Sequence, residues 1–150
     1  MRTDRSKTAT ASYTAAGLLR RVAAAFYDLL ILLAVLMLAT ALALLVARGE
    51  LDHGSAVFRA YLLLVCFLFY GWFWVHGGQT VGMRAWKIRV QQPDGRGITW
   101  KQALFRFLAA IPSWLLLGAG MLWILADREK MALHDRLSAT VVTRTSHGQY

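Results

Sequence analysis

Three long apolar runs dominate the pattern of the chain. Residues 22–47 contain one charge, Asp28, and residues 57–75 contain one charge, Arg59, close to the start of the run. A helix rises about 1.5 Å per residue, so runs of this length can cross the ~30 Å hydrocarbon core of a bilayer. We therefore predict membrane-spanning helices over residues 22–47 and 57–75.

The third run, residues 107–126, has no charged residue but contains Pro112, Gly118 and Gly120. Proline and glycine kink membrane helices or divide them into two half-helices. The pattern predicts a third span that is kinked or re-entrant. The predicted fold class is thus an all-α polytopic membrane protein with about three transmembrane helices.

Composition supports a membrane protein. Residues of the AVILMFWYC set make up 57% of the chain and there are 12 glycines besides, whereas the two together make up ~45–50% of a soluble domain. The formal net charge of +9 lies in blocks outside the apolar runs, so we expect no nucleic-acid partner. The single cysteine, Cys66, excludes an intrachain disulfide framework and a Cys-rich metal site.

Positive charge also predicts orientation, because Lys and Arg gather on the cytoplasmic side. Residues 1–21 carry five such residues and the 77–106 loop carries six, so both are expected in the cytoplasm. Three full crossings would give 11 positive residues inside and 6 outside, whereas a re-entrant third segment would give 15 and 2. The length of the run favours three crossings, which we take as the default, and the charge distribution favours the re-entrant alternative.

Outside the spans, residues 1–17 lack hydrophobic periodicity and predict a disordered basic tail, with a second short tail at 144–150. In the loop, residues 86–91 alternate apolar and polar, Pro93-Asp94-Gly95 supplies a turn, and alternation resumes over 98–100. This predicts a short cytoplasmic β-hairpin whose cations face anionic lipid headgroups. The alternative is a plain loop whose charges only set topology.

Asp28 is the most informative single residue. An aspartate within a membrane helix is costly unless it is neutral, paired or facing water. Arg84, or a hydroxyl such as that of Tyr70, could reach it from another segment. The alternative is a solvated residue two turns below the interface, without a functional role.

A second charged group follows the third run. Asp135 could pair with Arg21 across helices, and His134 is its neighbour. Equally, Asp135 could pair locally with Arg136 or cap a short helix. No HExxH motif, clustered carboxylates or G-x-S-x-G motif occurs, so we expect no metal site, no cofactor and no enzymatic activity.

Four stretches of the chain carry a family resemblance. They are LRRVAAAFYDLL at 19–30, GQTVG at 78–82, WKIRV at 86–90 and LHDRLSATVV at 133–142. In this order they resemble the RDD family of bacterial integral membrane proteins, over about residues 18–143. The sequence departs from the family pattern at Met83, where a basic residue is usual, and at Ser138-Ala139, where a glycine is usual.

The resemblance implies that Arg21, Asp28 and Asp135 are the arginine and two aspartates that name the family. It implies a multi-pass protein of the bacterial inner membrane that transports an unidentified small ligand or exchanges monovalent cations for protons. Three helices enclose little polar volume, and Ala39, Ala43 and Ala47 form a small-residue strip suited to helix packing, so we expect a homo-oligomer. The alternative is a non-transporting scaffold that binds anionic lipid or a partner protein.

Overall fold

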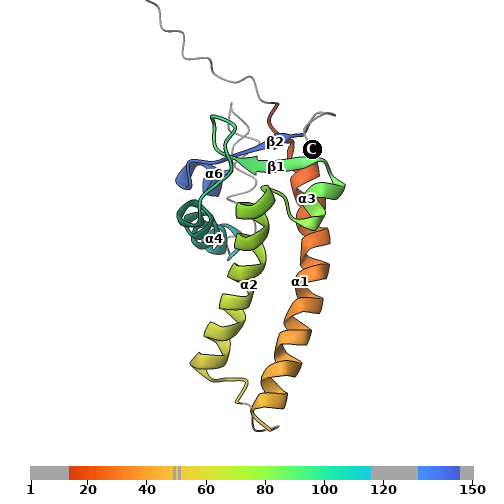
Figure 1. The fold of residues 1–150 in the computed structure, drawn as a ribbon, viewed down its shortest axis with the longest axis vertical. Helices are drawn as coiled ribbons and strands as arrows, with labels where there is room; N and C mark the ends of the chain where they lie inside the picture. The colour runs from red at the N-terminus through yellow and green to blue at the C-terminus, as the bar shows by residue number, and fades with distance from the viewer. Residues whose placement is uncertain (1–13, 49, 51, 116–131, 146–150) are drawn as a thin grey trace, which may run out of the picture.

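The structure, a computed structural model, describes residues 14–48, 50, 52–115 and 132–145. Two long helices, α1 (Leu18–Val46) and α2 (Ala56–Gly77), run side by side in opposite directions (Figure 1). Their far ends are joined by a short connection, and the remaining described elements gather at the opposite end. These elements, together called the cap, are α3 (Val81–Ala85), β1 (Ile88–Gln91), α4 (Trp100–Leu115), α6 (Leu133–Leu137) and β2 (Val141–Arg144).

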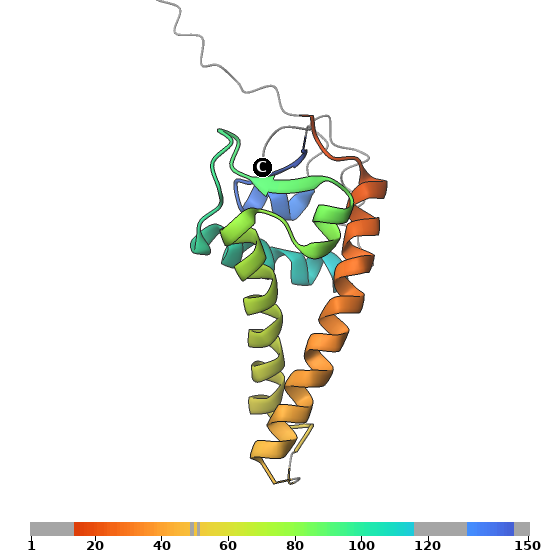
Figure 2. The same ribbon diagram turned by 45° about the vertical axis from the view of Figure 1, so that its right-hand side comes forward.

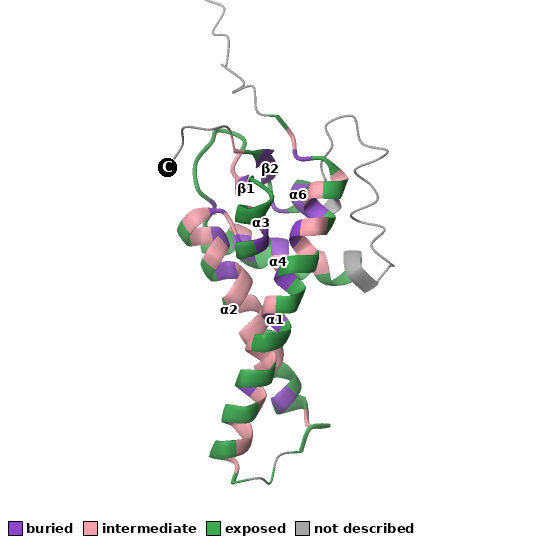
Figure 3. Ribbon diagram, turned by 90° about the vertical axis from the view of Figure 1, so that its right-hand side faces the viewer, coloured by how far each residue is buried: buried purple, intermediate pink, exposed green. Residues whose placement is uncertain are grey.

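Both long helices are apolar and long enough to cross a membrane, as predicted. The helix α1 begins before its apolar run and ends one residue short of it, and α2 extends slightly beyond its run at both ends. Few of their apolar side chains are buried, and Leu38 and Met37 are 63% and 67% exposed. Burial concentrates instead in the cap (Figure 3). Large contiguous apolar surfaces are rare on proteins surrounded by water, so this distribution is that of a membrane protein.

Local chemistry defines both ends of α2. The Ser55 hydroxyl accepts a hydrogen bond from the Phe58 backbone N–H at 3.2 Å, as helix N-cap residues do. Gly78 ends the helix in the left-handed conformation with φ of 66°. A Cβ atom at Gly78 would lie 2.4 Å from the Val90 carbonyl oxygen, so the chain turns tightly here into the cap.

The cap contains one described sheet, in which β1 and β2 pair in antiparallel fashion with Val90 opposite Val142. The first predicted strand, at residues 86–91, is present as β1, and the turn at Pro93-Asp94-Gly95 is present as well, since Gly95 N–H donates to the Gln92 carbonyl oxygen at 2.9 Å. The predicted hairpin partner at residues 98–100 is wrong, because β1 pairs with the C-terminal strand instead.

Residues 98–100 do not form a strand because a helix begins there. The Thr99 hydroxyl accepts from Gln102 N–H at 3.3 Å, and the Gln102 side chain accepts from Thr99 N–H at 3.0 Å. This reciprocal pair is a capping box, the T-x-x-Q form of a known helix-start signal. The capping box therefore starts α4 at Trp100, seven residues before the predicted third span.

The described parts of the predicted tails belong to the cap. Ala16 is fully buried and its N–H donates to the Val142 carbonyl oxygen at 2.9 Å, and Ala15 forms a bridge with Thr143. Arg144 lies in β2, opposite Ile88. Residues 14–17, which the sequence placed in a disordered tail, thus pack in the cap, β2 includes Arg144, and residues 1–13 and 146–150 lie outside the described residues.

The pairing of β2 with β1 bears on the two topologies predicted for the third run. The first part of that run belongs to α4, which lies crosswise at the cap ends of the two long helices (Figure 2). Residues 116–126 lie outside the described residues, but the chain on both sides of them lies in the cap. The default of a third full crossing is therefore not confirmed, and a C-terminal strand beside the loop is the placement that the re-entrant alternative predicts.

Cysteine labelling tests this arrangement on a Cys66→Ala background. In intact cells, Asp52→Cys is expected to react with an impermeant thiol reagent, whereas Thr99→Cys and Thr145→Cys should react only after permeabilisation. The reason is that residues 99 and 145 lie in the cap and residue 52 lies in the connection at the opposite end. Opposite labelling of residues 99 and 145 would contradict the shared location of the loop and the C-terminal strand.

Candidate functional site

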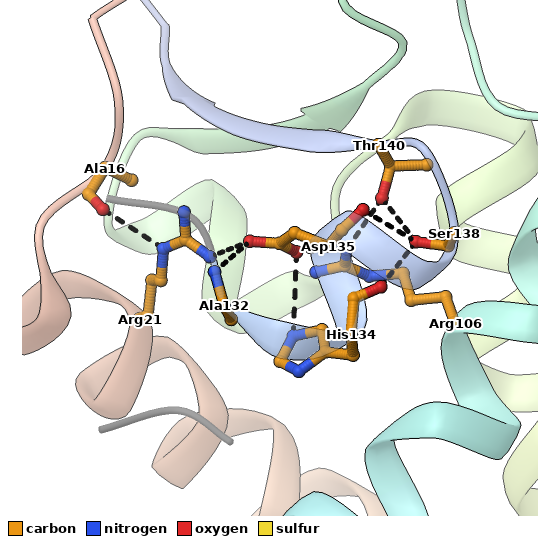
Figure 4. A network of polar contacts seen from close by, with 8 residues as sticks. All are labelled: Ala16, Arg21, Arg106, Ala132, His134, Asp135, Ser138 and Thr140. Atoms are coloured by element: carbon orange, nitrogen blue, oxygen red, sulfur yellow. Dashed lines mark hydrogen bonds and ion pairs between the residues drawn. The ribbon is translucent and has the colours of Figure 1, made fainter. Parts of the chain in front are cut away.

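A buried cluster of charges forms where α1, α4 and α6 meet in the cap (Figure 4). Its centre is Asp135 on α6, which is fully buried. One carboxylate oxygen accepts from Arg21 on α1, and the other accepts from Arg106 on α4. The predicted pair of Arg21 and Asp135 is thus present, and the cluster contains a second arginine that the prediction lacked.

Further hydrogen bonds hold the members of this cluster in place. Arg21 Nε donates to the Ala16 carbonyl oxygen at 3.0 Å, and Arg106 donates to the Thr140 hydroxyl at 2.9 Å. The backbone N–H of Ala132 donates to Asp135 at 3.1 Å. Charges removed from water need partners of this kind, because their solvation is lost on burial. The cluster therefore joins the N-terminal segment, α4 and the C-terminal part of the chain.

Among the described members of the cluster, two guanidinium groups surround one carboxylate. Burial alone would raise the pKa of Asp135, but Arg106 and Arg21 hold it well below its ordinary value. Burial lowers the pKa of Arg106, and Asp135 offsets part of that change. With Asp135 ionised and both arginines protonated, the net charge of these three groups is one positive unit.

Asp28 forms a second polar contact, between α1 and α3. It accepts a hydrogen bond from the Thr80 hydroxyl and another, at 2.8 Å, from the backbone N–H of Gly82. Its described partners therefore differ from the two that we expected. Arg84 is exposed at the end of α3, and Tyr70 stacks on Trp74 with 5.3 Å between ring centres.

The contact at Asp28 requires a very close approach of two backbones. A Cβ atom at Gly82 would lie 2.2 Å from the carbonyl oxygen of Ala24 and 3.0 Å from the Asp28 carboxyl carbon. Glycine permits such an approach because it has no side chain. Thr80 caps the N-terminus of α3 by accepting from Met83 N–H at 3.2 Å. The short helix is thus fixed against α1 at the level of Asp28.

A cavity of about 440 Å³ lies below the cap, between α1, α2 and α4. Ligand-binding sites typically fall between about 300 and 1,000 Å³. Most of its wall is apolar, and five polar or charged side chains from different elements line it. They are Arg21, Asp28, Tyr70, Arg106 and His134. Four of these five are residues that the sequence singled out, and the structure brings them to one cavity.

His134 faces this cavity beside the charge cluster and is 7% exposed. Burial, with the nearby positive charge of Arg106, lowers its pKa from 6.5 to about 4. The Asp135 oxygen lies 3.6 Å from Nε2 of His134. His134 is therefore neutral at physiological pH in the folded protein.

The pKa of His134 predicts a pH dependence of stability. Between pH 6.5 and about 4 the unfolded chain binds a proton at this residue that the folded chain does not, so the free energy of unfolding falls as the pH falls through this window. Asp135 adds a slope of the same sign only below about pH 5, where its carboxyl group begins to bind protons in the unfolded chain, so the two variants are compared above that pH. His134→Gln should flatten the profile measured by denaturation in detergent, and His76→Gln, at an exposed position on α2, should not. Equal slopes in the wild type and His134→Gln would contradict the assignment.

Sequence reasoning missed three contributors to these contacts. Arg106 is the last charge before the third apolar run and was counted only as a loop charge. Thr80 and Gly82 lie in the GQTVG stretch, which was recognised as a motif without a partner. The T-x-x-Q signal at Thr99 predicts a helix start just before Trp100. It would have placed Arg106 on a helix and not in the loop. Within the described ranges no three His, Cys, Asp or Glu residues are grouped to hold a metal ion.

Comparison with protein families agrees with this geometry. The family model described as "RDD family" matches residues 15–139, which is most of the chain. The chain belongs to the RDD family. Neither the curated proteins nor the solved structures contain a significant match. In this RDD protein, the matched region contains Arg21, Asp28 and Asp135 and ends just before the C-terminal strand β2.

Proposed function

We propose that this RDD protein is a transport subunit of the bacterial inner membrane in which Asp28 exchanges a proton for a monovalent cation. The observation that carries the proposal is the position of Asp28. It is 4% exposed, lies on a helix long and apolar enough to span a membrane, and lines the cavity below the cap. An ionisable residue at such a place is costly, and in membrane proteins it commonly marks an ion or proton pathway.

The charge cluster supports a gating role at the cytoplasmic rim in this proposal. Arg21 lines the cavity and is held by Asp135 from the cap, so movement of α6 would change the charge at the cavity wall. With its N-terminus in the cytoplasm, the cap would face the cytoplasm as well. The exposed apolar faces of α1 and α2 leave room for lipid or for further copies of the chain, and we expect a homo-oligomer.

Flux measurements on purified protein in liposomes test this proposal. A sodium or potassium gradient is expected to drive proton movement in the wild type, reported by an internal pH dye. Asp28→Asn should abolish it, because the amide keeps the shape of the carboxyl group but does not titrate. Asp52→Asn, at an exposed position in the connection between the long helices, should retain it. Unchanged flux in folded Asp28→Asn protein would exclude this residue as the carrier.

A scaffold function is the second candidate, and a specific observation favours it. Both oxygens of Asp28 and both oxygens of Asp135 accept hydrogen bonds that join segments distant in sequence. In this candidate the contacts serve only to stabilise the fold, and no ion is transported. The cap would then bind anionic lipid or a partner protein. This candidate predicts a folded wild-type protein with no sodium- or potassium-driven proton flux at all.

A further inference from the structure

The helix α4 presents its apolar side chains outward and its buried charge inward. On the inner face, Arg106 is 3% exposed and Ala103 is fully buried. The large apolar side chains of the outer face are 37% to 62% exposed, and they are Trp100, Leu104, Phe105, Leu108 and Ile111. A surface helix of a protein in water has the reverse arrangement, with charged and polar residues outside. This reversal indicates that the medium outside α4 is apolar.

The outer side chains form one continuous surface, called here the outer stripe. It runs from Trp100 to Ile111 with a spacing of mostly three or four residues, which is the period of a single helix face. Among the described side chains of α4, the one exposed charge is that of Lys101, in the first turn. A lysine at the end of such a stripe can extend its amine to lipid headgroups. The outer stripe is thus apolar over three helical turns.

The contacts between α4 and α2 show that the two helices cross. Phe67 on α2 contacts both Trp100 and Phe107, with 6.1 and 5.5 Å between ring centres. Trp100 and Phe107 are two turns apart on α4, so a single level of α2 meets a long stretch of α4. Figure 2 shows the same crosswise arrangement. If α2 spans the membrane, α4 therefore lies roughly parallel to the membrane plane.

The depth of α4 follows from its contact with Gly71. A Cβ atom at Gly71 would lie 2.9 Å from the Trp100 ring, so the helices touch at this residue. The helix α2 has 22 residues and a length of about 33 Å, so its ends lie close to the edges of a ~30 Å hydrocarbon core. Gly71 precedes the last residue of α2, Gly77, by about 9 Å along the axis. A helix that lies in a membrane interface is buried by about 5–10 Å, which is the same depth.

We propose that α4 is an interfacial helix whose outer stripe contacts the acyl chains of the leaflet on the cap side. The support for lipid as the occupant is continuity with the spanning segment. On α2, Leu68 and Trp72 follow the contact residues Phe67 and Gly71 directly in sequence, and both are exposed. The lipid that surrounds α2 at this level therefore also reaches the outer stripe. The proposal does not rest on transport by Asp28.

Spin-label accessibility in liposomes tests the proposal. Leu104→Cys, Phe105→Cys and Leu108→Cys are made on a Cys66→Ala background, labelled with a nitroxide and reconstituted into phosphatidylcholine liposomes. Oxygen concentrates among acyl chains and a nickel chelate remains in water, so the ratio of their effects on the label reports its depth. We expect oxygen to dominate at all three positions, with depths of about 5–10 Å below the headgroup boundary.

Two reference positions calibrate the measurement. Asp94 lies in the exposed turn of the loop, so the nickel chelate should dominate at Asp94→Cys. Leu33 is 56% exposed near the middle of α1, so Leu33→Cys should give the greatest depth. The melting temperature of each labelled variant is compared with that of the Cys66→Ala protein, and the exposed positions on α4 provide three independent readings.

Three other results would each overturn the proposal. Dominance of the nickel chelate at the α4 positions would mean that the outer stripe faces water. Depths equal to that of Leu33→Cys, or a steady increase from residue 104 to residue 108, would mean that α4 lies at the bilayer centre or crosses it. Low accessibility to both reagents would mean that protein covers the stripe, either another segment or a second copy. None of these results depends on ion flux, so this proposal and the transport proposal fail separately.

Discussion

Asp135→Asn is expected to destabilise the folded protein by about 3–5 kcal/mol, the usual cost of removing one partner from a buried ion pair. The asparagine has nearly the same volume, so the effect is electrostatic. Without the carboxylate, the buried guanidinium groups of Arg21 and Arg106 lose the negative charge that they share. Denaturant titration of the purified protein in detergent measures the change in the free energy of unfolding.

Asp94→Asn is the matched control for this substitution. Asp94 also pairs with an arginine, Arg96, but the pair lies in an exposed turn of the loop. Exposed pairs contribute about 0–1 kcal/mol, so this variant should unfold nearly as the wild type does. A loss at Asp135 no larger than that at Asp94 would mean that the buried cluster does not form.

Gly82→Ala is expected to detach α3 from α1, at a cost of about 1–3 kcal/mol. The added methyl group would lie 2.2 Å from the Ala24 carbonyl oxygen, and neither backbone can give way without moving α3. Because Gly82 N–H donates to Asp28, the shift would also lengthen that hydrogen bond. The same denaturant titration measures the loss.

Gly97→Ala controls for the intrinsic effect of replacing glycine. A Cβ atom at Gly97 meets nothing within 4 Å, so the substitution should change the free energy of unfolding by only a few tenths of a kilocalorie. Equal stability of Gly82→Ala and Gly97→Ala would show that α3 does not pack on α1 at this level.

The sequence predicted the two long helices well because their signal is local and strong. Long apolar runs interrupted only by Asp28 and Arg59 have few alternatives to a membrane helix. The β1 strand and the turn after it were likewise predicted from local alternation and turn residues. The strand's partner was not, because β2 lies some fifty residues further along the chain and nothing local specifies that pairing.

Charge patterning and span length made different predictions about the third run. The distribution of Lys and Arg favoured a cytoplasmic C-terminal segment, and the pairing of β2 with β1 agrees with it. The uncharged length of residues 107–126 favoured a crossing, whereas the described part of that run belongs to α4, which begins at Trp100 and lies across the cap. Length shows that a segment can span a membrane, whereas packing partners decide whether it does.

For the site, pairing by opposite charge succeeded where the choices were few. Arg21 and Asp135 were joined from the sequence by their opposite charges, with Arg136 as the local alternative for Asp135. The partners of Asp28 were missed because they are a hydroxyl and a backbone N–H, which carry no charge to search for. Arg106 was missed because a charge next to an apolar run is usually a solvated end of a helix.

Double-mutant cycles test most directly the claim that Asp135 holds α1 and α4 together. Arg21→Gln, Arg106→Gln and Asp135→Asn are made singly and in pairs, and the free energy of unfolding of each is measured. The account predicts coupling energies of about 0.5–3 kcal/mol for each arginine with Asp135, because both contacts share one carboxylate. Strict additivity in both cycles would contradict it.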